Sequence, residues 1–167
     1  MKKKVSIVKL IEEKPKMYSV LFNSLPLEGV KELKMDDILN SDLSLNMKSE
    51  IIGNLFLTKP EYIRLNLLIG NVIATVFEKS YPEETGPREL MELGREYLRK
   101  KITFHELEQK KAEMAGDLMY TMSPSGRNSF SKFVMVANQT AEEAAGSEFE
   151  SLFNEITDIL ICFCRRS

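Results

Sequence analysis

The sequence predicts an all-α protein, a single-domain irregular bundle of about six to eight helices around a central apolar helix at residues 60–80. Only 8 Gly and 6 Pro occur in 167 residues, which is few for a chain built of short strands and tight turns. Apolar residues recur at helical spacing along most of the chain, and no segment alternates persistently enough to predict a strand. The length fits one domain over residues 1–167.

The N-terminal third predicts short helices separated by turns. Residues 5–25 have helical spacing that Pro15 interrupts, which predicts two short helices or one kinked helix. Residues 26–46 are rich in turn residues and predict a loop with one or two helical turns. Residues 47–57 return to helical spacing and predict the next helix.

The central helix has the clearest start signal in the chain. Thr58 and Glu61 stand three apart with Pro60 between them, so hydroxyl and carboxylate can each satisfy a free backbone N–H. The following residues, 62–77, are apolar around most of the helix circumference. A helix of this kind is stable only when neighbours cover it, so we expect it at the centre of the bundle.

Four further helices are predicted after the central one. Pro87 suits the first turn of a helix over residues 87–100, and Thr103 with Glu106 repeats the capping pattern before a helix over residues 103–120. The short connection predicts that these two helices are antiparallel. Helices are also expected over residues 129–145 and 146–163.

Composition excludes several classes of partner and location. The net charge of −2 gives no basic excess for holding nucleic acid, so no nucleic-acid partner is expected. The longest apolar segment, residues 62–77, contains Arg64, Asn66 and Asn71 and is too short to span a membrane. The lysine-rich N-terminus lacks the uninterrupted apolar run and cleavage site of a signal peptide. With only two cysteines, a cytoplasmic protein is expected.

Residue patterns for catalysis or metal binding are missing, so we expect no enzyme activity, no cofactor and no metal. His105 is the single histidine, and Gln109 stands where a metalloprotease helix needs a second one. We expect His105 at an ordinary surface position. Cys162 and Cys164 lie about 200° apart around a helix. They cannot face one metal ion together, and a buried structural role is expected for them.

The charge distribution supplies the candidate binding residues. Residues 133–164 contain six carboxylates and no Lys or Arg, whereas residues 1–27 contain six lysines and two glutamates. The carboxylates are Glu142, Glu143, Glu148, Glu150, Glu155 and Asp158. They form either a solvated helix face or a surface that steers a basic protein partner. Arg88 is the best polar candidate outside this region, with a structural pairing to a carboxylate as the alternative.

One stretch resembles a known family. The sequence FEKSYPEETGPR at residues 77–88, then ELMELGREYL and KITFHEL, resembles the all-helical immunity proteins of bacterial polymorphic toxin systems, the group numbered fifth among immunity families. The match covers about residues 71–115, and Tyr81, Pro82, Pro87 and Arg88 carry most of it. The resemblance implies an antidote that binds a cognate toxin domain and has no catalysis of its own.

Three hypotheses for function follow. The first is a non-enzymatic immunity protein that binds and occludes a toxin. The second is a regulatory or scaffold module that binds a partner helix or peptide in a groove lined by some of the nine methionines. The third, an enzyme with a carboxylate-based site, has the least support because spacing alone places no pair of titratable groups together.

Overall fold

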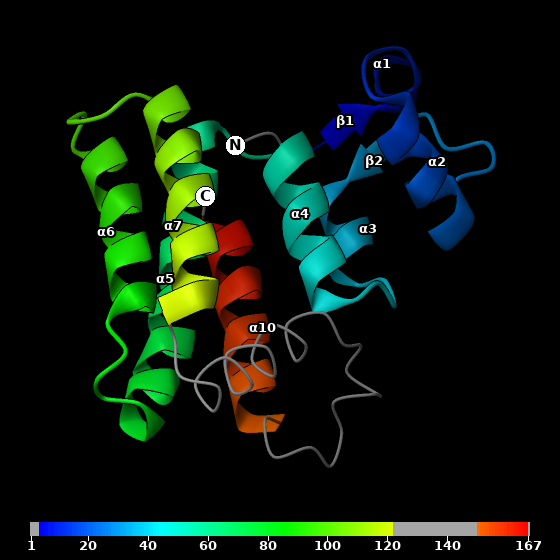
Figure 1. Ribbon diagram of the computed structural model, residues 1–167. Coiled ribbons are helices and arrows are strands. Elements are labelled where there is room, and N and C mark those ends of the chain that lie inside the picture. Colours follow the sequence, from blue (N-terminus) through cyan, green and yellow to red (C-terminus); the bar gives the residue numbers. More distant parts are fainter. Residues whose placement is uncertain (1–3, 122–149, 167) are drawn as a thin grey trace.

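A computed structural model describes residues 4–121 and 150–166 of the chain. These residues contain eight helices and one two-stranded sheet, which confirms the all-α fold class (Figure 1). The N-terminal part contains β1 (Lys4–Ser6), α1 (Ile7–Glu13), α2 (Pro15–Ser24), β2 (Glu32–Lys34), α3 (Met35–Leu39) and α4 (Leu45–Leu55). The remaining helices are α5 (Lys59–Ser80), α6 (Gly86–Leu98), α7 (Phe104–Thr121) and α10 (Glu150–Arg166). The predicted helix over residues 129–145 lies outside the described residues.

The small sheet is a feature that the sequence did not predict. β1 and β2 pair antiparallel, with Val5 opposite Leu33, and Lys4 bonds Glu32 at 2.8 Å on the exposed side. Each strand has three residues, too few to show a pattern of alternation. Leu33 is fully buried, so the pairing fixes an apolar side chain of the loop in the core.

The predicted helix starts are confirmed in atomic detail. The N–H and hydroxyl of Thr58 both donate to Oε2 of Glu61, at 2.8 and 2.7 Å. These bonds lower the pKa of Glu61 to about 2. Thr103 and Glu106 repeat the arrangement at the start of α7, where the N–H of Glu106 also donates to the Thr103 hydroxyl at 3.2 Å. Pro15 separates α1 from α2, as predicted for two short helices.

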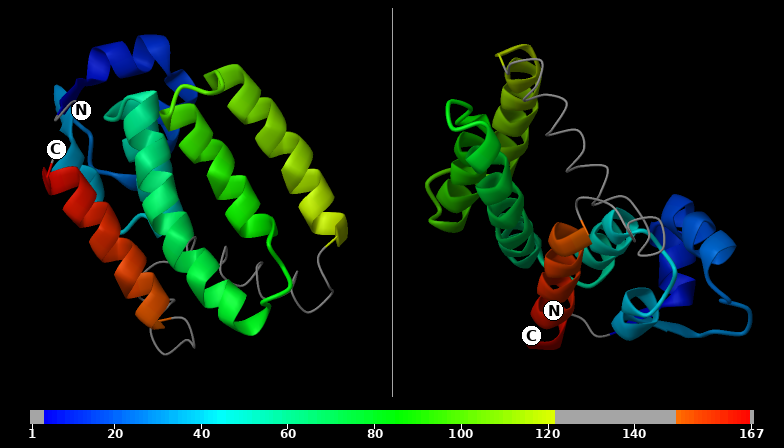
Figure 2. Two further views of the ribbon diagram at one scale, coloured as in Figure 1. Left: turned by 90° about the vertical axis from the view of Figure 1, so that its left-hand side faces the viewer. Right: turned by 90° about the horizontal axis from the view of Figure 1, so that it is seen from below.

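Four of the helices form a layer, with α5 inside it. Figure 2 shows α10, α5, α6 and α7 side by side in that order, and successive members are in contact. α5 also contacts α4, which confirms its central position. The prediction that neighbours cover the apolar circumference of α5 holds at Ile63, Leu65 and Phe77, which are buried, and is wrong at Leu68, which is 48% exposed.

One cluster of buried apolar residues connects the N-terminal part with this layer. It includes Leu10 and Ile38 from the N-terminal part, Phe77 from α5 and Ile156 from α10. α10 contributes a stripe of buried residues spaced four apart, namely Leu152, Ile156, Leu160 and Cys164. Seen from below in Figure 2, α10 lies between α5 and the N-terminal helices, so its stripe is central to this shared core.

Close packing between α4 and α5 depends on Gly53. A Cβ at this position would lie 2.7 Å from Cζ of the Tyr62 ring. We expect Gly53→Ala to lower the free energy of unfolding by about 1 to 3 kcal/mol, because the ring must shift out of a packed position. In a Tyr62→Ala background the same substitution should cost much less.

Chemical denaturation measures the free energy of unfolding of these variants. Gly70→Ala is the matched control. Gly70 is also helical, but a Cβ there would meet its nearest neighbour, Sδ of Met91, at an ordinary 3.4 Å. This control should be neutral or slightly stabilising, because Ala favours helix over Gly. An equal cost of Gly53→Ala with and without the Tyr62 ring would contradict the packing argument.

Candidate partner-binding surfaces

The structure places two of the six predicted carboxylates on one surface. Glu155 and Asp158 are both exposed and lie one turn apart on α10, opposite its buried stripe. Glu150 is the first residue of α10. The positions of Glu142, Glu143 and Glu148 lie outside the described residues.

Arg88 holds two helices together, which confirms the structural alternative for this residue. From the first turn of α6, its Nε donates to Oε1 of Glu78 at 2.7 Å. Nη1 donates to Oδ1 of Asn71 at 2.6 Å, and Nη2 lies 3.1 Å from Oγ1 of Thr75. Asn71, Thr75 and Glu78 share one face of α5 at helical spacing, so the guanidinium spans two turns of that face. Its nitrogens are therefore engaged within the protein.

The remaining chemical candidates lie apart from one another. His105 is exposed on the first turn of α7, as predicted. Cys164 is buried, which raises the pKa of its thiol to about 11, whereas Cys162 is exposed, so the prediction of burial is wrong for Cys162. Residues 4–121 and 150–166 contain no cluster of three or more His, Cys, Asp or Glu that could hold a metal ion. No polar or charged side chain is buried in this part of the chain.

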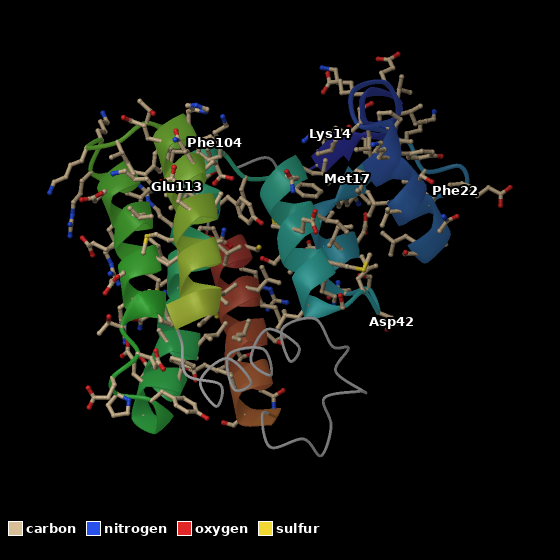
Figure 3. The ribbon with its side chains drawn as sticks, in the orientation of Figure 1. Lys14, Met17, Phe22, Asp42, Phe104 and Glu113 are labelled. Carbon is tan, nitrogen blue, oxygen red and sulfur yellow. The ribbon has the colours of Figure 1, made fainter. Side chains whose placement is uncertain are left out.

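An open apolar groove lies between the α1–α2 corner and α4. It has a volume of about 750 Å³. Its apolar lining consists of Met17 and Val20 from α2 and Met47 and Ile51 from α4, and we call it the methionine groove. Figure 3 shows Met17 and Lys14 on the side of the corner that faces α4, with Phe22 further out on α2.

The rim of the methionine groove carries charges of both signs. Glu13, Lys14 and Lys16 line it at the corner, and Glu50 lines it from α4. Nζ of Lys14 donates to the backbone carbonyl of Asn54 at 3.0 Å, which ties the corner to the end of α4. Val20 is 44% exposed, so part of the apolar lining is open to solvent.

The position of the methionine groove had no direct signal in the sequence, although both of its components were indicated. Pro15 predicted the break that creates the corner, and the high methionine count suggested adaptable apolar surface. Helical spacing could not tell which methionines line a groove and which fill the core, because both sets occupy apolar stripes.

Comparisons with known proteins add no family to this geometry. No model of a known protein family, no curated protein and no solved structure matches the chain. In the described residues, no helix is both long and apolar enough to cross a membrane.

The Arg88 contacts predict a loss of stability when they are removed. We expect Arg88→Ala to lower the free energy of unfolding by about 1 to 2 kcal/mol, because a charged, half-buried donor and three acceptors lose their partners. Arg88→Lys should recover only part of this, since an ammonium lacks the planar fork. Both are measured by urea denaturation.

Arg99→Ala serves as the control for that series. Arg99 pairs with Glu92 at 2.8 Å, but its side chain is 57% exposed, so the change should stay within about 0.5 kcal/mol. If Arg88→Ala had the same free energy of unfolding as the wild type, the bonds of Arg88 to α5 would contribute nothing to stability.

Proposed function

We propose that this protein is a non-enzymatic binding protein and that the methionine groove holds an amphipathic helix of a protein partner. The observation that carries the proposal is the open, 750 Å³ apolar groove between two helices. Its volume lies in the range usual for binding pockets, which are mostly lined by apolar side chains and often form between helices. We propose that this binding takes place in the cytoplasm, which the low cysteine count supports.

The spacing of the lining residues supports a helical occupant. Met17 and Val20 are three residues apart on α2, and Met47 and Ile51 are four apart on α4. Each wall therefore presents neighbouring side chains of one helix face, with a space between them that an apolar ridge of a third helix can fill. Methionine side chains adapt to ridges of different shape because they are unbranched and flexible.

The rim charges suggest which helix fits. Glu13 and Glu50 lie on the two sides of the groove, while Lys14 and Lys16 lie at the corner. A partner helix with an apolar stripe flanked by residues of both signs complements this rim, whereas a uniformly charged helix meets like charge on one side.

A selection experiment tests the groove. A library of 16-residue amphipathic peptides is screened against the whole chain, and selected peptides should carry apolar residues at i, i+3 or i+4, and i+7. Val20→Glu should weaken their binding by about tenfold or more in fluorescence anisotropy, because it places a carboxylate in the apolar lining.

Phe22→Glu is the matched control, since Phe22 lies on the same helix, is 51% exposed and does not line the groove. Its affinity should stay within about twofold of wild type. Equal weakening by both substitutions, or selection of peptides without helical spacing, would contradict the assignment of the groove.

A second proposal is that the partner is a toxin domain, which this protein occludes. Its support is the resemblance of residues 71–115 to immunity proteins, together with the exposed pair Glu155 and Asp158 on α10. An acidic surface raises the association rate with a basic domain by electrostatic steering.

Co-expression tests this second proposal. The variable C-terminal domain of a large secreted protein encoded beside this chain should stop growth when expressed alone and permit growth when both are expressed. Glu155→Lys with Asp158→Lys should slow association and reduce its dependence on salt, measured by stopped-flow fluorescence. Failure of rescue would exclude the toxin as partner and leave the peptide result unaffected.

A further inference from the structure

The turn between α6 and α7 contains an unusual backbone conformation. Lys100 has φ of 59°, and among the described residues it is the only one other than glycine with positive φ. Its N–H donates to the carbonyl of Tyr97, and the N–H of Lys101 donates to that of Glu96, both at 2.9 Å. This pair of bonds defines a Schellman motif, in which glycine is the favoured residue at the position of Lys100 because a Cβ is crowded there.

Lys100 lines a cavity of about 470 Å³ between this turn and the first turns of α5 and α7. Arg64 and Lys101 add two further cations to the lining, and Tyr97 and Ile102 add apolar surface. Figure 3 labels Phe104 at this end of the layer, far along the molecule from Asp42. We call this site the basic cavity, and it lies apart from the methionine groove.

The cations of the basic cavity differ from their neighbours in having no ionic partner within the described part of the chain. Arg95 and Arg99 both pair with Glu92, and Nζ of Lys59 lies 4.1 Å from the centroid of the Phe104 ring. In contrast, no ion pair joins Arg64, Lys100 or Lys101 to any carboxylate of residues 4–121 and 150–166.

One carboxylate, Glu106, also lines the basic cavity. Its Oε2 accepts from the N–H and hydroxyl of Thr103, at 2.7 and 2.8 Å, so it is used to cap α7. These bonds lower the pKa of Glu106 and keep it charged at neutral pH. The cavity therefore has three cations and one anion, which leaves an excess of positive charge.

We propose that the basic cavity binds a phosphate monoester, with the phosphate held by Arg64, Lys100 and Lys101 and the esterified group packed against Tyr97 and Ile102. Guanidinium and ammonium groups together suit a phosphate dianion. The proposal explains why a lysine occupies a position where glycine is easier to accommodate, since its side chain contributes charge to the site. It does not depend on the function proposed for the methionine groove.

Lys100→Gly separates a binding role from a purely structural one. The substitution should raise the thermal midpoint by about 2 to 4 °C, because glycine adopts positive φ without steric crowding. It should weaken binding of phenyl phosphate by about tenfold in isothermal titration calorimetry, because one cation is lost. Lys110→Ala removes a cation of α7 that does not line the cavity and should change affinity by less than about twofold.

Glu106→Gln provides a change in the opposite direction. Glutamine also completes a capping box with threonine, so α7 keeps its start while the cavity loses its negative charge. Phenyl phosphate should then bind about three- to tenfold more tightly. Inorganic phosphate should bind more weakly than phenyl phosphate, both to the wild type and to Glu106→Gln. Tighter binding of a phosphotyrosine tripeptide than of phenyl phosphate would identify the ester as one carried by a protein. Tighter binding of phenyl phosphate would identify it as a free small molecule.

Two results would overturn the proposal. One is a wild-type protein that shows no binding of phenyl phosphate at low ionic strength. The other is unchanged affinity in Lys100→Gly, since a lysine that serves only the turn would alter the thermal midpoint alone.

Discussion

The structure depends on burial of one face of α10. This helix comes from the C-terminal end of the chain, and its stripe of Leu152, Ile156 and Leu160 is buried in the core shared by α5 and the N-terminal helices. Burying three such side chains contributes roughly 5 to 9 kcal/mol before ordering entropy is subtracted. Together with the direct packing of α4 on α5, this burial joins the N-terminal part to the helical layer. The opposite face of α10 stays free to carry Glu155 and Asp158.

This arrangement leaves the polar chemistry of the described residues on the surface. Their buried side chains are all apolar, and the charged groups that do interact, such as Arg88 with Glu78, join the exteriors of neighbouring helices. The two candidate sites follow from how helices meet at their ends: the methionine groove where Pro15 turns α1 into α2, and the basic cavity where Lys100 turns α6 into α7.

Local signals in the sequence predicted the elements of the fold. Contacts between segments far apart in the sequence were not predicted. Thr58 with Glu61, and Thr103 with Glu106, are hydrogen-bonded within four residues, so their spacing alone predicted both helix starts. The pairing of Val5 with Leu33 joins segments 28 residues apart, and three-residue strands show no periodicity. The candidate sites were harder to predict for the same reason. Arg88 was identified as a candidate, but its bonds to α5 became visible only once α6 was placed against that helix. The left-handed conformation of Lys100 could not be predicted from the sequence, because the usual indicator of that conformation is a glycine and this position is a lysine.

The two walls of the methionine groove differ in how firmly they are held. On α4, Ile51 and its neighbours Ile52 and Leu55 are buried, and Gly53 lets α4 pack closely against Tyr62. On α2, Leu21 is the one buried residue, and Val20 and Phe22 are both substantially exposed. Local opening costs least where few apolar contacts are broken, so α2 opens more readily than α4. Lys14, bonded to Asn54 at the corner, ties the start of α2 to the end of α4. For the proposed binding of a helix, one firmly held and one loosely held wall would accommodate helices of different thickness, and methionine at both Met17 and Met47 suits that requirement because it repacks without strain.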